Sequence, residues 1–169
     1  MSTTESDYLV RLAALSLSFV GFSTIVVTLR GALGGQMSDR HVRLVRLYIE
    51  GGFLVTALAL VPTMLHMLGV AAAVTWPLAS TIAALIFTWV LATQYRRRRA
   101  IEPGPFPLWV VVIYAISAVM VIRLWLNAVG WPQPAGAGAY AAVLTWALGL
   151  FGFIFVRTIE LFLHKAPPS

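Results

Sequence analysis

Glu50 is an acidic residue in a part of the chain that is apolar enough to cross a membrane. Between it and Arg96 the sequence contains no other aspartate, glutamate, lysine or arginine. An ionisable side chain is costly at membrane depth, so such a residue is usually paired or functional. Arg46 precedes Glu50 by about one helical turn, which puts both side chains on the same face of a helix.

A second pair of charges, Arg157 and Glu160, lies near the end of the last apolar segment, at a depth comparable with that of Glu50. We therefore predict a network of four charges, because each would otherwise be unpaired in a low-dielectric setting. Its members are Arg46, Glu50, Arg157 and Glu160. The network could simply hold two spans together, which is the role we expect. The functional alternative is a proton or ion pathway in which Glu50 titrates.

Three more polar residues are expected at the opposite side of the membrane: Arg11, Arg123 and Asn127. Asp7 stands four residues before Arg11 and is a suitable local partner. We expect both arginines to extend towards the headgroups of the outer leaflet, where Asn127 could join them. If Arg11 and Arg123 instead share a cavity, that cavity is cationic and would favour anions.

Residue types exclude several kinds of chemistry. The chain has no cysteine, which rules out disulfides, thiol catalysis and thiolate metal sites. His41, His66 and His164 are expected at different depths, so they do not form a metal or haem site. Acid–base catalysis would have only Glu50 and Glu160 to use. We therefore expect no catalytic residues, no metal and no cofactor, and a protein that is not an enzyme.

The composition is that of a membrane protein. Sixty per cent of the 169 residues are hydrophobic, 11% are charged and the mean hydropathy is +0.87. About 20 apolar residues suffice for one membrane-spanning helix. We predict an all-α fold, a compact bundle of five spans in one polytopic domain that covers residues 1–169. The expected spans are 8–29, 42–68, 76–95, 107–129 and 140–164.

The distribution of basic residues predicts the orientation. Ten of the 12 lysines and arginines fall on one side of the predicted spans, and Arg11 and Arg123 fall on the other. This places the N-terminus outside and the C-terminus in the cytoplasm of a bacterial-type plasma (inner) membrane, with no signal peptide to remove. The net charge of +6 therefore reflects topology and does not indicate nucleic-acid binding. The expected partner is the lipid bilayer.

Four consecutive arginines, Arg96, Arg97, Arg98 and Arg99, follow the span at 76–95 in a predicted loop. Their first role is topogenic, and they also form a candidate site for anionic lipid headgroups.

Small residues recur at every fourth position in two spans and predict close helix packing. One stripe consists of Ser80, Ala84, Thr88 and Ala92, and the other of Ala141, Thr145 and Gly149. Continuing the second stripe places Arg157 towards the bundle interior. Packing within one copy and a homo-oligomeric interface both fit these stripes.

The run Arg43-Leu-Val-Arg46-Leu-Tyr-Ile-Glu50 resembles the Arg…Asn…Glu stretch of the membrane-associated proteins of glutathione metabolism. The resemblance covers fewer than 30 residues. Arg46 stands where that family has asparagine, and five spans are predicted here in place of four. The resemblance implies a small membrane enzyme that handles lipids or glutathione conjugates.

The leading hypothesis is a self-associating, non-enzymatic membrane protein that conducts, transports or senses ions through its Glu/Arg network. The first alternative is an accessory or structural subunit of a larger membrane complex, and the minor alternative is the membrane enzyme just described.

Overall fold

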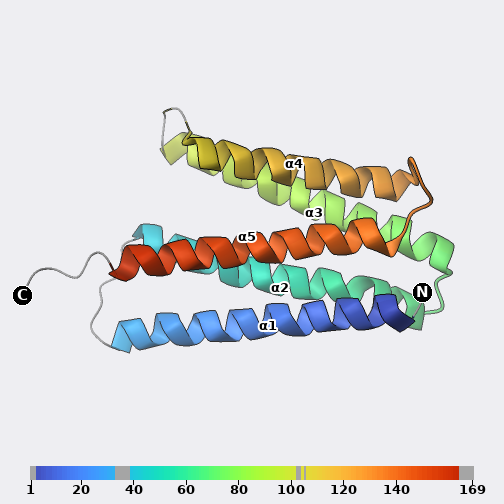
Figure 1. Ribbon diagram of the computed structural model, residues 1–169, viewed down its shortest axis with the longest axis horizontal. Helices are drawn as coiled ribbons and strands as arrows, with labels where there is room; N and C mark the ends of the chain where they lie inside the picture. The colour runs from blue at the N-terminus through green and yellow to red at the C-terminus, as the bar shows by residue number, and fades with distance from the viewer. Residues whose placement is uncertain (1–2, 33–38, 102–103, 105, 164–169) are drawn as a thin grey trace, which may run out of the picture. The chain divides into compact units, whose positions relative to one another are not determined.

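The computed structural model describes residues 3–32, 39–101, 104 and 106–163. Within these residues the chain is helical and contains no strand (Figure 1). The five helices are α1 (Thr3–Ala32), α2 (Asp39–Met67), α3 (Ala72–Ile101), α4 (Leu108–Val129) and α5 (Ala137–Leu163).

All five helices are long and apolar enough to cross a membrane. Their apolar stretches are 27, 23, 29, 22 and 23 residues long, in chain order. About 20 residues span the hydrocarbon core at 1.5 Å per residue. The prediction of an all-helical chain with five candidate membrane spans is therefore confirmed.

The bounds of α3 differ from the prediction at both ends. We expected Pro77 at the first helical position, but the helix begins at Ala72. The N–H of Thr75 already bonds to the carbonyl of Ala71, so a helical turn precedes the proline. Pro77 is therefore the sixth residue of α3 and lies inside the helix, where its missing N–H costs one helical hydrogen bond.

At its other end α3 continues through Arg96–Arg99, which we expected in a loop, and ends at Ile101. Arginine is a good helix former, and cations are favourable near a helix C-terminus. These two preferences outweigh the loop signal that the nearby prolines supplied.

The described chain divides into two compact units, and the division falls inside α2 and α5. One unit contains residues 61–143, with the end of α2, all of α3 and α4, and the first turns of α5. The other contains residues 2–60 and 144–169, with α1, most of α2 and most of α5. That residues 1–169 act as one transmembrane domain stays a prediction.

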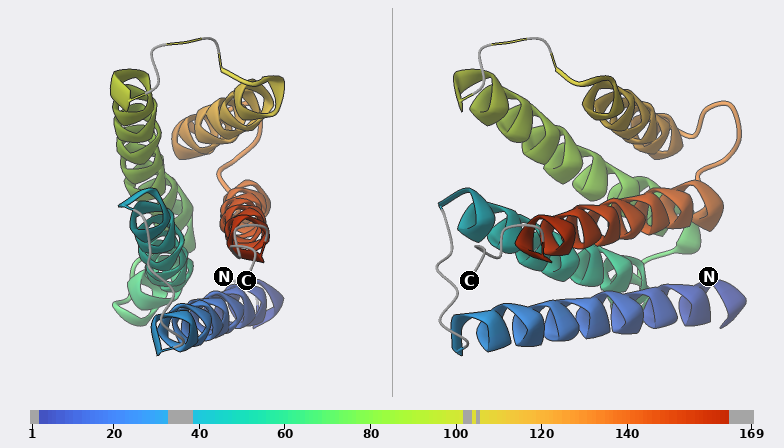
Figure 2. Two further views of the ribbon diagram at one scale, coloured as in Figure 1. Left: turned by 90° about the vertical axis from the view of Figure 1, so that its left-hand side faces the viewer. Right: turned by 60° about the vertical axis from the view of Figure 1, so that its left-hand side comes forward.

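In the unit of residues 61–143, α3 packs along α4 (Figures 1 and 2). The small-residue stripe of α3 contributes to this contact. Ser80 and Ala84 are fully buried. Thr88 accepts a hydrogen bond of 3.3 Å from the indole N–H of Trp125 on α4. The predicted packing role of this stripe is therefore confirmed at these positions.

Two glycines end helices in this unit. Gly69 follows α2 with φ +79°, and Gly130 follows α4 with φ +70°. The next residue in each case, Val70 or Trp131, donates its N–H to a carbonyl five positions back. This left-handed ending satisfies late carbonyls of the helix, and glycine adopts it without steric strain.

In the unit built on α1, α2 and α5, two adjacent glycines let the helices approach closely. A Cβ atom at Gly51 would overlap the ring of Phe151 on α5, and one at Gly52 would overlap Val20 on α1. The hydroxyl of Ser16 donates to the carbonyl of Gly52 at 2.8 Å. Gly51 and Gly52 therefore serve as close-packing positions next to Glu50 in the sequence.

An aromatic cluster joins the three helices of the same unit. Phe155 of α5 contacts Phe19 of α1 edge-on at 5.4 Å and Tyr48 of α2 at 5.2 Å, measured between ring centroids. Edge-to-face pairs at such distances are favourable beyond their buried area.

The stripe that we predicted on α5 makes only part of the contact with neighbouring helices: Thr145 shares a hydrogen bond of 2.7 Å with the hydroxyl of Tyr8 on α1, but the large buried residues lie on another face. The buried side chains of α5 in this unit are Leu144, Ala147, Phe151, Phe155 and Thr158. Gly149, from the predicted stripe, is exposed, and a Cβ atom there would meet nothing within 4 Å. Large apolar residues at helical spacing decide which face of α5 packs. Arg157, which continues the stripe, is accordingly exposed rather than directed into the interior.

Candidate functional site

Arg46 and Glu50 form an ion pair on α2. The Nε atom of Arg46 donates to Oε1 of Glu50 at 2.5 Å across one helical turn. The pair is not enclosed by its own chain, since 76% of the Arg46 side chain and 60% of the Glu50 side chain are exposed. An ionisable residue therefore stands on the surface of a helix that is apolar enough to cross a membrane.

The helical repeat of α2 explains this placement. Tyr48, Gly51, Gly52 and Val55 are buried. The exposed positions, at helical spacing, are Arg46, Glu50, Phe53 and Ala57. We call these four residues the Glu50 face. The glycines that allow close packing lie beside Glu50 in sequence, but they direct its side chain away from the helices they contact.

The other two members of the predicted network lie on α5. Arg157 is exposed, and the side chain of Glu160 lies outside the described residues. Among the described side chains, the structure brings together Arg46 and Glu50. The four-charge network stays a prediction beyond that pair.

Asn127, which we expected near the lipid headgroups, is buried with 8% of its surface exposed. Its amide nitrogen donates to the Ser80 hydroxyl at 2.7 Å and to the carbonyl of Gly136 at 3.1 Å. Its amide oxygen accepts from the N–H of Gly136 at 3.1 Å. A buried amide needs hydrogen-bond partners, and these partners connect α4 with α3 and with the start of α5.

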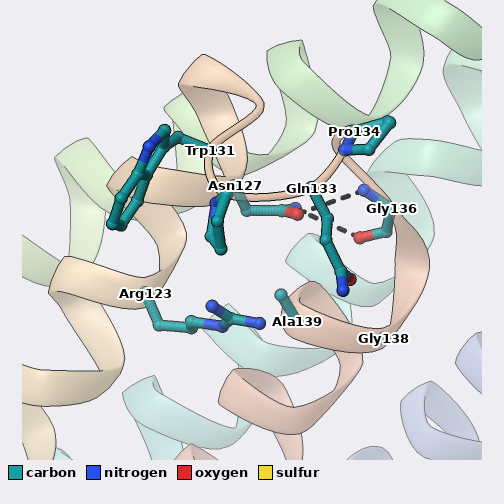
Figure 3. A pocket seen from close by; sticks show the side chains of 9 residues that line it. Arg123, Asn127, Trp131, Gln133, Pro134, Gly136, Gly138 and Ala139 are labelled. Carbon is teal, nitrogen blue, oxygen red and sulfur yellow. Dashed lines mark hydrogen bonds between the residues drawn. The ribbon is translucent and has the colours of Figure 1, made fainter.

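Arg123 lies one turn before Asn127 and lines a cavity of about 270 Å³ (Figure 3). The other residues around it are Asn127, Trp131, Pro132, Gln133, Pro134, Gly136, Gly138 and Ala139. The ends of the Arg123 and Gln133 side chains extend towards the same space beside Ala139 (Figure 3). Arg11, the other predicted outer cation, is exposed on α1 and does not line this cavity.

Sequence reasoning identified Arg123 and Asn127 but missed the loop residues around them. The available signal was their four-residue spacing, which places both on one side of α4 facing the Gly- and Pro-rich connection. The bonds between Asn127 and Gly136 were not predictable, because they depend on how that connection folds back.

The four arginines at the end of α3 divide into two groups. Arg96, Arg97 and Arg99 are exposed, and Arg99 differs from the first two in lying against aromatic rings. The guanidinium of Arg98 lies 5.4 Å from the ring centroid of Phe106, and that of Arg99 lies 5.2 Å from the same ring. Cations at such distances from a ring face are attracted to its π electrons.

Further aromatic contacts hold this end of α3 against α4. Tyr95 meets Phe106 and Tyr114 edge-on at 5.8 and 5.9 Å between centroids. The hydroxyl of Tyr95 also accepts a hydrogen bond from Nε of Arg99 at 3.2 Å. Arg98 and Arg99 therefore contribute to packing at this end of α3, and the lipid-headgroup site stays a prediction.

No three His, Cys, Asp or Glu side chains gather into a metal-binding group within the part of the chain that the structure describes. Comparisons with protein families, with curated proteins and with solved structures find no match for this chain. Its function is therefore inferred from the geometry and charge of the described residues.

Proposed function

We propose that the chain is a multi-pass membrane protein that self-associates through the Glu50 face. In that assembly the Arg46–Glu50 pairs form the polar centre of an ion-conducting, transporting or sensing protein. The observation that supports this proposal is the exposure of Glu50, 60% of whose side chain is uncovered.

The exposed Glu50 side chain lies at a depth where lipid tails would surround it if nothing else covered it. Glu50 lies five residues inside the candidate span Val45–Met67, or about 8 Å at 1.5 Å per residue. Lipid tails offer no hydrogen bonds, so charged residues at such depths face protein or water. A covering surface from another protein or a water-filled path would meet that need.

The charges of the Glu50 face suit contact with the same face of a second copy of the chain. Two copies inserted in the same direction and related by a two-fold axis present equal depths to each other. The Arg46–Glu50 pair of one copy then lies at the same depth as the pair of the other copy. Each Glu50 faces the partner copy, and Arg46 lies one turn away. Two arginines and two glutamates give a cluster without net charge, and the small side chain of Ala57 lets the helices approach further along.

The proposed setting is a bacterial-type plasma membrane, with the N-terminus outside and the C-terminus in the cytoplasm. The bias of lysine and arginine supports this orientation. Arg157 and Glu160 would extend the polar centre on α5.

Native mass spectrometry of the protein in nanodiscs tests the association. We expect the wild type and Asp7→Asn, which removes an exposed carboxylate from α1, to give the same oligomer. We expect Glu50→Arg to dissociate it, and the double variant Arg46→Glu, Glu50→Arg to restore it, because the pair is re-formed with reversed polarity. An oligomer that survives Glu50→Arg would refute the proposed contact.

Flux into proteoliposomes tests the role in ion movement. Glu50→Gln removes the ionisable group while keeping the side-chain shape, so we expect proton or ion flux to fall while Asp7→Asn keeps it. Unchanged flux in an intact Glu50→Gln oligomer would eliminate the pathway. A protein that is monomeric alone but purifies with a larger complex would favour the accessory-subunit alternative instead.

A further inference from the structure

The cavity beside Arg123 has the chemistry of an anion site. It is lined by one cationic side chain, by the Gln133 amide and by the first turn of α5, at Gly138 and Ala139. The lining contains no carboxylate, and its apolar part consists mainly of Trp131, Pro132 and Pro134. The site differs in place and in charge from the Arg46–Glu50 pair.

Among the described residues of the unit that contains Arg123, none carries a carboxylate. Residues 61–143 contain a single acidic residue, Glu102, which precedes α4 in sequence. Arg123 lies 15 residues after the first residue of α4, about 22 Å along the helix. Its guanidinium makes no hydrogen bond or ion pair to any residue that the structure describes.

The wall of the cavity is held in place by Asn127. Two hydrogen bonds of 3.1 Å join its amide to the backbone of Gly136 and so fix the connection between α4 and α5. A third, to Ser80, anchors the amide to α3. The cavity is therefore supported by bonds that leave Arg123 and Gln133 uncommitted, which is the arrangement a ligand site requires.

We propose that this cavity binds a phosphate oxyanion, from either an anionic lipid headgroup or inorganic phosphate. A guanidinium presents paired N–H donors that match two oxygens of a phosphate. The first N–H groups of α5 have no partner within their helix and can add donors at Gly138 and Ala139. A volume of about 270 Å³ suits a small anion or one headgroup rather than a larger organic ligand.

Depth favours a phosphate over other anions. Arg123 lies six residues before the end of α4, about 9 Å along the helix. A long arginine side chain reaches the headgroup region from such a position, and phosphates are the anions concentrated there. A Cβ atom at Gly138 would meet nothing within 4 Å, so the cavity can be filled from that residue without displacing a neighbour.

Two measurements separate the two sources of phosphate. For the free anion, thermal unfolding of the whole protein is followed in a zwitterionic detergent, with sodium phosphate against sodium chloride at equal ionic strength. For the lipid, native mass spectrometry counts the phosphatidylglycerol retained per chain from nanodiscs of phosphatidylglycerol and phosphatidylcholine.

We expect at least one response in the wild type: a higher unfolding midpoint in phosphate, or one phosphatidylglycerol retained per chain. Arg123→Gln and Gly138→Leu should both abolish that response, the first by removing the donor and the second by filling the cavity. Arg123→Lys should retain part of it, because the charge stays and the paired donors are lost.

Arg11→Gln is the matched control, because it removes an arginine that is exposed but does not line the cavity. It should leave the response unchanged. The proposal is overturned if the wild type shows neither response, if both pocket variants keep it, or if Arg11→Gln loses as much as Arg123→Gln. In each of these cases Arg123 is an interfacial arginine only.

Discussion

Asn127 donates a hydrogen bond of 2.7 Å to the hydroxyl of Ser80, and this bond connects α4 with α3 between two buried side chains. The same amide closes on the backbone of Gly136. One side chain therefore sets the packing of two helices and the path of the connection that follows.

Replacing Asn127 by alanine should destabilise the protein by about 1–2 kcal/mol, since three hydrogen bonds are lost and single interhelical bonds are modest in membranes. Thermal or denaturant unfolding in detergent measures this loss. Gln133→Ala is the control, because Gln133 is exposed in the same connection. If both variants unfold alike, the amide of Asn127 does not stabilise the fold.

Gly51→Ala should lower stability, because the new methyl group would overlap the ring of Phe151. Overpacking of this kind costs about 1–3 kcal/mol. The companion variant Gly149→Ala meets open space, and alanine is the better helix former, so it should be neutral or slightly stabilising. A denaturant series on the two variants and the double variant Gly51→Ala, Phe151→Leu checks the cause. If the overlap with the Phe151 ring causes the loss, the double variant should be more stable than Gly51→Ala alone. A double variant that is no more stable would contradict this cause.

Binding of the protein to anionic lipid should depend on Arg96 and Arg97 rather than on its total charge. Both are exposed at the end of α3, and the guanidinium groups of Arg98 and Arg99 are held against aromatic rings, although Arg99 is exposed as well. At about 1 kcal/mol per basic residue near an anionic surface, the variant Arg96→Gln, Arg97→Gln should bind phosphatidylglycerol vesicles roughly 10- to 30-fold more weakly. Cosedimentation of protein in neutral nanodiscs with charged vesicles measures this. Equal binding by wild type and variant would contradict a headgroup site.

The absence of cysteine allows the orientation to be mapped with single introduced thiols. Gln133→Cys, in the connection between α4 and α5, should react in intact cells with a thiol reagent that cannot cross membranes. Gly104→Cys, between α3 and α4, should react only after the cells are opened. The opposite pattern would invert the proposed topology.

The sequence predicted the number and type of helices because long apolar runs leave few alternatives in a chain of this composition. It misplaced the ends of α3, where the helix preference of four arginines extends the C-terminal end and a helical turn before Pro77 extends the N-terminal end. The free-energy difference between helix and turn is small at such positions, and a pattern of residue types does not show its sign.

The candidate sites were predicted unevenly for a related reason. Arg46 and Glu50 pair through the spacing of one helix, which a sequence displays directly. Arg157 was placed on a stripe of small residues, but Phe151 and Phe155 bury more apolar surface and turn the opposite face of α5 inwards. The cavity at Arg123 depends on bonds between Asn127 and a connection without regular structure, and no helical period describes that path.

Gly69 and Gly130 end α2 and α4 through backbone bonds alone. Lysine or arginine side chains can also satisfy the last carbonyls of a helix. Here the two connections that follow, residues 68–71 and 130–136, contain no charged residue. In the proposed topology these are the segments that must pass through the hydrocarbon layer while the protein is being inserted. Because glycine ends these helices without a charged side chain, no charge in these two connections has to cross the hydrocarbon layer during insertion.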